Sequence, residues 1–148
     1  MIFDIATIPV SPYSVLELLS QSHPCPDLSP ERFHSLILQL PVNQRIFVCN
    51  EDGKEIGIIS VLIEQRLSHG GYPVAHISDL ETDASCDTYR VCTELITRAI
   101  EEARSRSCCR VVVPVREERH RLFEGLGFSE TQGLHVLSLI RLNTVPSF

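Results

Sequence analysis

The residues best suited to chemistry lie where a predicted strand, residues 72–82, gives way to a predicted helix that begins near Thr88. The first turn of a helix has backbone N–H groups without intrahelical partners, and the helix dipole places partial positive charge there. Such a junction can bind a phosphate or diphosphate. Thr88, Tyr89 and Arg90 could supply donors to the anion. Asp87 would repel it, and the alternative role of Asp87 is to cap the helix.

The elements around this junction predict an α/β fold. Apolar residues recur at three- and four-residue steps through the helix, and the β-branched run at 111–115 predicts a buried strand. Asp52-Gly53 predicts a hairpin turn. Gly57 predicts either a bulge or a close approach of a neighbouring element, and Pro114 predicts that strand pairing fails on one side. Strands are predicted at 3–8, 46–49, 55–67, 72–82, 111–115 and 134–142, and helices at 13–20, 30–40, 88–106 and 118–126. This order predicts one domain over residues 1–148, with a mixed sheet and helices on both faces.

Charge and composition narrow the classes of partner. The 148-residue chain carries a net charge of −6 and has no run rich in Lys or Arg. Nucleic acids and anionic membranes are therefore poor partners, whereas local cations and backbone N–H groups can still bind a phosphorylated small molecule. No apolar run approaches membrane-spanning length, and the first ten residues lack the pattern of a secretory signal. We expect a cytoplasmic protein.

The six cysteines are expected to be buried reduced thiols. They lie mostly within apolar runs, and no two have the C-x-x-C spacing of paired metal ligands. We therefore expect no metal site.

Three stretches of the sequence resemble the GCN5-related N-acetyltransferases (GNAT), and most closely their glucosamine-6-phosphate N-acetyltransferase branch. They are residues 66–71 (RLSHGG), 76–80 (HISDL) and 123–128 (FEGLGF). The resemblance runs from about residue 13 to residue 142. It implies the GNAT fold, acetyl-CoA as co-substrate, direct transfer of acetyl to the amine of an amino-sugar phosphate, and a homodimer in which a second subunit completes the sugar site.

The resemblance also implies where acetyl-CoA binds. Leu80, Glu81 and Thr82 occupy the contact positions on the strand, where a backbone N–H faces the thioester oxygen, and Pro114 lets the neighbouring strands part. By this resemblance, the diphosphate is bound by a loop whose family motif is Arg/Gln-x-x-Gly-x-Gly/Ala. This sequence departs from that motif at three positions and lacks its glycines, which let the backbone approach phosphate closely. The residues implied at this loop are Asp87, Thr88, Tyr89, Arg90, Val91 and Cys92, with Asp87, Arg90 and Cys92 at the departing positions.

Catalytic and acceptor roles come from the same resemblance. Where the branch has a Glu-Asp pair, this chain has Ser78-Asp79, so deprotonation of the amine would fall to Asp79, His76 or a water chain. Phe123 replaces the family's tyrosine and cannot donate a hydrogen bond to the leaving thiolate, which would slow turnover about 10²-fold. The residues implied to bind the sugar phosphate are Arg66, His69, Ser78, Asp79 and Arg141, the last standing two residues beyond the aligned Leu139.

Two functions remain open at this stage. The first is an acetyl-CoA-dependent N-acetyltransferase acting on glucosamine 6-phosphate or a related amino sugar. The second is a catalytically impaired binding or dimerisation module, because the cofactor loop, Ser78 and Phe123 all depart from the family pattern. A different acceptor, such as a peptide, is less favoured because Arg66 and His69 are retained.

Overall fold

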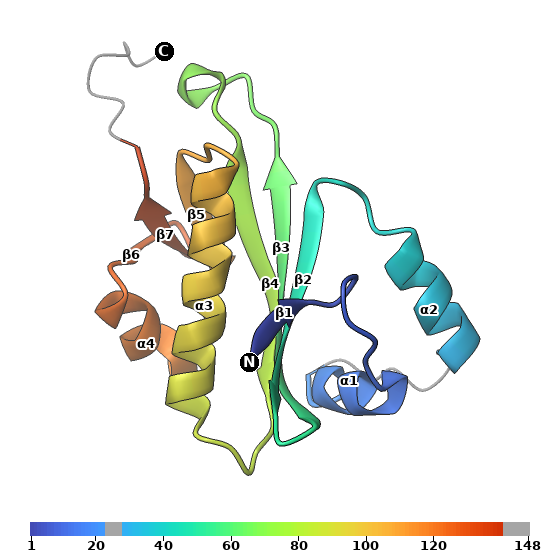
Figure 1. The fold of residues 1–148 in the computed structure, drawn as a ribbon. Helices are drawn as coiled ribbons and strands as arrows, with labels where there is room; N and C mark the ends of the chain where they lie inside the picture. Colours follow the sequence, from blue (N-terminus) through green and yellow to red (C-terminus); the bar gives the residue numbers. More distant parts are fainter. Residues whose placement is uncertain (23–27, 141–148) are drawn as a thin grey trace.

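The computed structural model describes residues 1–22 and 28–140, and the predicted substrate residue Arg141 lies outside this part of the chain. The described residues form one seven-stranded sheet in the order β1-β2-β3-β4-β5-β7-β6 (Figure 1). Its strands are β1 Ile2–Asp4, β2 Gln44–Glu51, β3 Lys54–Glu64, β4 Val74–Thr82, β5 Arg110–Pro114, β6 Ser129–Thr131 and β7 Leu134–Ser138. The helices are α1 Pro12–Leu19, α2 Pro30–Leu38, α3 Thr88–Ser105 and α4 His120–Gly125, with short 3₁₀ turns η1 His69–Gly71 and η2 Glu117–Arg119.

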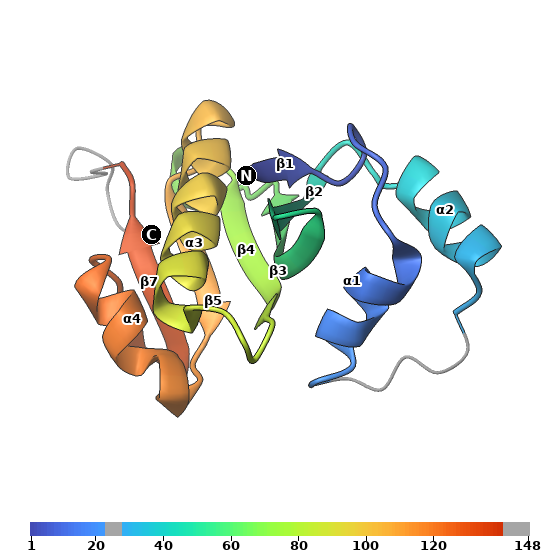
Figure 2. The same cartoon turned by 60° about the horizontal axis from the view of Figure 1, so that its bottom comes forward.

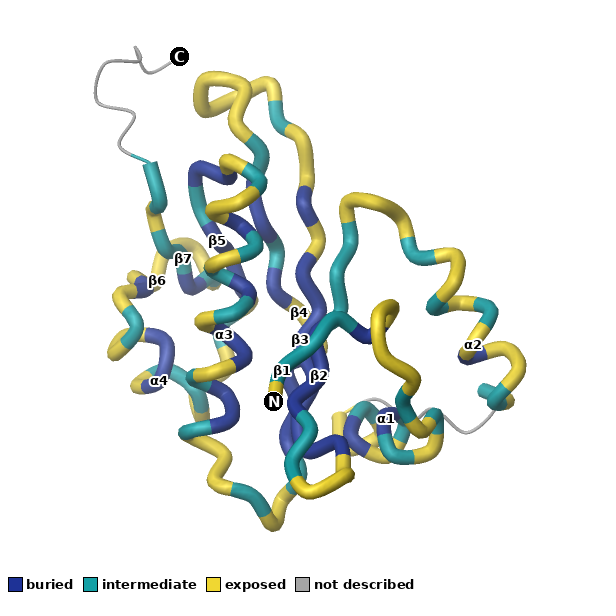
Figure 3. The backbone as a smooth tube through the Cα atoms, in the orientation of Figure 1, coloured by how far each residue is buried: buried dark blue, intermediate teal, exposed yellow. Residues whose placement is uncertain are grey.

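Helices cover both faces of the sheet, as the sequence predicts. α3 and α4 lie on one side, and α1 and α2 lie on the other (Figure 2). Alternate side chains of β2 pack into the two cores on opposite faces of the sheet. Phe47 packs into the α3 core, while its neighbour Val48 packs beneath α1 and α2. The buried backbone is concentrated in the central strands and on the sheet-facing side of α3 (Figure 3).

Local sequence accounts for the main turns and for the close packing of α3. Asp52 and Gly53 have φ values of 52° and 79°, which close the tight β2–β3 hairpin. A Cβ at Gly57 would lie 2.7 Å from Val91 Cγ1 and 2.9 Å from Leu95 Cδ1. Gly57 is therefore the close-neighbour site that the sequence suggests, and it lets α3 approach β3.

The ends of β4 and β5 part, and this feature creates the candidate site. The two parallel strands pair only from Val74↔Arg110 to His76↔Val112, although both continue further. Pro114 pairs with β7 and not with β4, as expected for a residue without an N–H. On the other side of β4, the register with β3 shifts between Ile58 and Ser60, and Asp79 takes a φ of 50°. β4 therefore bulges where it has lost its parallel neighbour.

Several strands differ from the sequence expectation. β3 ends at Glu64 and not at residue 67, and β7 ends at Ser138 although the prediction extended to residue 142. The first strand ends at Asp4, not at residue 8, because the Asp4 carboxylate accepts a hydrogen bond from the Ala6 N–H at 2.9 Å and turns the chain. β6 was not predicted because its three residues are all exposed and show no apolar alternation. It forms a hairpin with β7 through Gln132 and Gly133, which have φ values of 48° and 79°.

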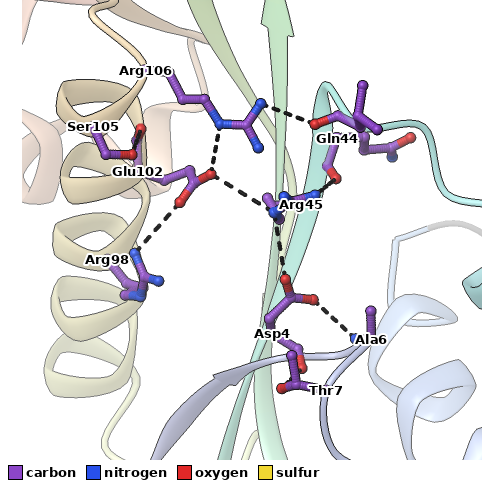
Figure 4. Close-up of polar contacts among 10 residues, drawn as sticks. Asp4, Ala6, Thr7, Gln44, Arg45, Arg98, Glu102, Ser105 and Arg106 are labelled. Atoms are coloured by element: carbon purple, nitrogen blue, oxygen red, sulfur yellow. Dashed lines mark hydrogen bonds and ion pairs between the residues drawn. The ribbon is translucent and has the colours of Figure 1, made fainter.

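A polar network ties the C-terminal half of α3 to the edge of the sheet (Figure 4). The largely buried carboxylate of Glu102 lies 3.1 Å from Arg106, 3.8 Å from Arg45 and 3.9 Å from Arg98. Arg45 continues to Asp4 of β1 at 3.5 Å. The network holds the helix whose opposite end forms part of the candidate site. None of the helices in the described ranges is long and apolar enough to cross a membrane.

Candidate active site

A groove opens between the parted ends of β4 and β5. Its cavity has a volume of about 240 Å³ and receives residues from β4, β5, η2 and α4. The lining residues are Ile77, Ser78, Asp79, Leu80, Glu81, Val113, Pro114, Arg116, Arg119 and Phe123. The predicted groove beside Asp79 and Pro114 is therefore present in the structure.

Two arginines of the η2 segment cross this groove to β4. The Arg119 side chain is only 13% exposed, and its Nη1 donates a hydrogen bond to the Leu80 carbonyl. Its Nη2 lies 3.9 Å from the Glu81 carboxylate, which also accepts hydrogen bonds from Arg116 at 3.4 Å and from Ser22 at 2.5 Å. The Glu81 side chain is 7% exposed, so these cations compensate a carboxylate that has little access to water.

The N-terminus of α3 lies directly after β4, as predicted, and Asp87 caps it. Asp87 Oδ1 accepts a hydrogen bond from the Arg90 N–H at 3.2 Å, so the capping role that the sequence left open for Asp87 is confirmed. The Arg90 guanidinium is held by Glu51 at 2.6 Å and by Glu94 at 3.3 Å. These contacts turn both the backbone donor and the charge of Arg90 toward partners within the protein.

The other predicted cofactor residues at this junction differ in their exposure to solvent. The Thr88 hydroxyl lies 3.5 Å from the Thr82 hydroxyl, which joins the helix to the end of β4, and Tyr89 is exposed. Val91 and Cys92 are fully buried in the α3 core, so their side chains face away from the surface. The first-turn N–H groups of Thr88 and Tyr89 therefore remain the best candidates to bind an anion here.

The loop between β4 and α3 is ordered by Asp83. Its carboxylate lies 2.6 Å from Lys54 Nζ and accepts hydrogen bonds from the backbone N–H and the hydroxyl of Ser85. The Lys54 contact, followed by the two bonds from Ser85, lowers the pKa of Asp83 far below its usual range. The charged carboxylate thus fixes the approach of the chain to the helix N-terminus.

The predicted catalytic residues meet at the groove. Ser78 and Asp79 are exposed on β4, and Phe123 is buried on α4 with its ring against the groove wall. The Phe123 ring lies nearly parallel to the ring of His135, with centroids 5.1 Å apart. His135 is fully buried, and neither ring nitrogen has a hydrogen-bond partner among the described residues. Burial, followed by the nearby His120, lowers the pKa of His135.

The predicted sugar-phosphate residues Arg66 and His69 lie elsewhere, in the β3–β4 hairpin. Arg66 Nε lies 2.8 Å from Glu64 Oε1, and the same oxygen lies 2.9 Å from His76 Nε2. Hydrogen bonds from His76 and then from Arg66 lower the pKa of Glu64. His69 is exposed and has a φ of 54°. The structure does not bring this pair to Asp79 within one chain.

Comparison with known proteins identifies this arrangement. The family model described as "Acetyltransferase (GNAT) family" matches residues 13–128, which include the groove and the first turn of α3. The chain belongs to the GNAT acetyltransferase family. The observed fold and the groove agree with the resemblance found in the sequence.

Relatives within the GNAT family carry more specific names. The chain is 28% identical over 118 residues to a glucosamine 6-phosphate N-acetyltransferase from Trypanosoma brucei brucei, a match covering 78% of this chain and 80% of the relative. The crystal structure of a Trypanosoma brucei acetyltransferase matches with a TM-score of 0.77 and 25% identity, covering 89% and 94% of the two chains. The glucosamine-6-phosphate N-acetyltransferase from Arabidopsis thaliana has the same fold, with a TM-score of 0.78 at 18% identity and coverage of 95% and 96%.

Family membership establishes the general activity. The protein is an N-acetyltransferase of the GNAT type, and the co-substrate of this family is acetyl-CoA. The parted strands and the α3 N-terminus suit an extended ligand that carries a diphosphate. Two backbone groups there already have partners, because Asp87 accepts from the Arg90 N–H and Arg119 donates to the Leu80 carbonyl.

Sequence reasoning missed the roles of Arg116 and Arg119 in this GNAT site. Glu117 and Glu118 separate these two arginines, so they form no basic run in the sequence, although they are three residues apart and follow the strand that contains Pro114. That spacing places both on one side of a helical turn and could have revealed them.

No cysteine lines the groove in the part of the chain that the structure describes. The five cysteines within the described residues are free thiols, and burial raises the pKa of Cys108 to about 11. Cys25 lies outside the described residues. Within residues 1–22 and 28–140, no three His, Cys, Asp or Glu side chains come together as a possible metal site.

Proposed function

We propose that this N-acetyltransferase transfers acetyl from acetyl-CoA to the amine of an amino-sugar phosphate, with glucosamine 6-phosphate as the leading acceptor. The observation that carries the proposal is the bulged end of β4, which exposes Ser78 and Asp79 beside the groove. The names of the sequence relatives support this class of acceptor.

The backbone of β4 can polarise the acyl group. Acetyl-CoA supplies a thioester, whose carbonyl oxygen becomes negatively charged when an amine attacks. Asp79 and Leu80 have no register partner in β3 or β5 within the described part of the sheet. An N–H group of this stretch can therefore donate to the developing oxyanion, and the bulge fixes its direction before the reaction starts.

Asp79 is the favoured proton acceptor. Ser78 cannot take a proton at neutral pH, and His76 Nε2 already contacts Glu64. The Asp79 carboxylate is exposed at the mouth of the groove. It can accept the amine proton directly or through one water. Phe123 offers no proton to the departing thiolate, so we expect slow turnover.

The hairpin residues Arg66 and His69 suit a phosphate bound in a neighbouring copy's groove. Arg66 lies beyond the residue that pairs with Val74, and its guanidinium shares the Glu64 carboxylate with His76, which stands three residue steps, about 10 Å of extended chain, before Asp79. This span exceeds the distance between the amine and the phosphate of one hexosamine phosphate. We therefore place Arg66 and His69 in trans, in a homodimer related by a two-fold axis.

A thiol-release assay with acetyl-CoA and glucosamine 6-phosphate tests the activity. We expect release that requires both substrates. Arg66→Ala should raise KM for the sugar phosphate while kcat changes little, because a phosphate contact acts on binding. Arg104→Ala is the matched control, since it removes an exposed arginine that makes no ion pair within the described residues. An unchanged KM for Arg66→Ala would refute the assigned phosphate site.

Calorimetric titration separates this function from an impaired module. Binding of acetyl-CoA without thiol release would favour a cofactor-binding module over an enzyme for this acceptor. Absence of both binding and release would contradict both functions.

A further inference from the structure

Arg119 bridges the groove at the stretch where β4 has no parallel partner. Pairing of β4 with β5 stops at His76↔Val112, and the Leu80 carbonyl lies beyond that point. Arg119 belongs to η2, which follows β5, and its Nη1 donates to this carbonyl. The guanidinium thus replaces the strand neighbour that Leu80 lacks, and its side chain is 13% exposed.

Glu81 gives the same guanidinium a second partner within the groove. Its Oε2 lies 3.9 Å from Arg119 Nη2, while its Oε1 is held by Ser22 and Arg116. The carboxylate is therefore fixed from two sides, independently of Arg119. A guanidinium that leaves the Leu80 carbonyl can form a tighter pair with Glu81 without entering water, which lowers the free-energy cost of the movement.

We propose that Arg119 is a gate that closes the groove in the free protein and controls entry of the co-substrate. This inference rests on the proposed use of acetyl-CoA. The amide-bearing arm of that molecule needs backbone partners along β4. Leu80 lines the cavity, and its carbonyl is held by Arg119. Entry of the arm exchanges the guanidinium donor for an amide donor, and Arg119 moves to Glu81. Arg119 thereby selects ligands that can replace its hydrogen bond.

The gate makes a prediction of definite sign. Replacing a residue that binds the co-substrate lowers the protein's affinity for it. Replacing a residue that competes with the co-substrate raises that affinity. Arg119→Met removes the donor and retains an unbranched side chain, and Arg119→Ala also removes the bulk. Arg116→Ala is the charge-matched control, because Arg116 shares the Glu81 partner but the Leu80 carbonyl is bound by Arg119.

Calorimetric titration with acetyl-CoA is the experiment, after circular dichroism has shown which variants are folded. We expect both Arg119 variants to bind about tenfold more tightly than the wild type, because a hydrogen bond from a charged donor no longer has to be broken. Arg116→Ala should not bind more tightly. If Arg119→Ala fails to fold, the conservative Arg119→Met variant decides the result.

The possible results separate the gate from the proposed function. Binding by the Arg119 variants but not by the wild type supports the gate in its strongest form. Equal or weaker binding by the variants, with a wild type that binds, overturns the gate and leaves the acetyltransferase function intact. An equal gain in Arg116→Ala also overturns it, because the effect would then come from charge alone. Absence of binding in every protein overturns both proposals.

Discussion

Replacement of Gly57 by alanine should push α3 away from β3. The added Cβ would lie 2.7 Å from Val91 Cγ1 and 2.9 Å from Leu95 Cδ1, both closer than carbon atoms approach in folded proteins. Val91 and Leu95 are fully buried, so neither side chain can swing out into solvent. The contact therefore has to be relieved by movement of the helix whose first turn borders the groove.

The expected size of the effect follows from two opposing contributions. Gly→Ala in a strand without positive φ stabilises a protein by about 0.5–1 kcal/mol, because the unfolded chain loses freedom. Overpacking a tight core costs about 1–3 kcal/mol. Overpacking should dominate at 2.7 Å, so we expect Gly57→Ala to lower the free energy of unfolding by about 1–2 kcal/mol.

A double-mutant cycle with Val91→Ala tests the cause directly. Val91→Ala alone should destabilise through a cavity, but in the Gly57→Ala background it removes the nearest clashing methyl. The two changes should therefore be less costly together than their sum, by at least about 1 kcal/mol in urea unfolding. Additive effects, or a Gly57→Ala protein as stable as the wild type, would refute the reasoning.

Three further predictions concern the Glu102 network, pH and the α3 cap. Glu102→Gln should lower the free energy of unfolding by about 1–2 kcal/mol in urea, because it leaves three arginines around a neutral side chain. Stability should fall as the pH drops below 6.5, because burial lowers the pKa of His135 and the unfolded chain then binds a proton that the folded protein excludes. Asp87→Asn should tighten acetyl-CoA binding several-fold by calorimetry with little loss of stability, because Asn also caps helices but carries no charge.

Each of these predictions has a matched control. Glu101→Gln changes a neighbouring exposed carboxylate on α3 and should leave the urea midpoint unchanged. His135→Leu should make the free energy of unfolding nearly independent of pH between pH 7 and 5.5. If the pH dependence persists in this variant, other groups cause it. The carboxyls of Glu64 and Asp83 have lowered pKa values, so they do not titrate in this window. Asp87→Ala removes the helix cap as well as the charge, so this variant should be less stable. If Asp87→Asn binds acetyl-CoA with unchanged affinity, the diphosphate lies elsewhere.

Much of the fold could be predicted because its determinants are local. Ser29 caps α2, Asp52-Gly53 closes the first hairpin, and the apolar repeat places α3 against the sheet. The prediction of strands failed where the apolar alternation was weak or where a side-chain hydrogen bond ended the strand. Exposed β6 has no alternation, and the Asp4 carboxylate ends β1 by bonding to the Ala6 N–H.

For the site, the sequence by itself determined the order of the elements, the strand–helix junction and the residue types available at the bulge, because these depend on spacing along the chain. Only the tertiary structure decided that Arg119 spans the groove to Leu80 and that Arg66 lies far from Asp79 within one chain. The Arg119–Leu80 contact joins residues 39 positions apart in the sequence. Both arrangements follow from strand register, from the parting of β4 and β5, and from the burial of Glu81, which no local pattern encodes.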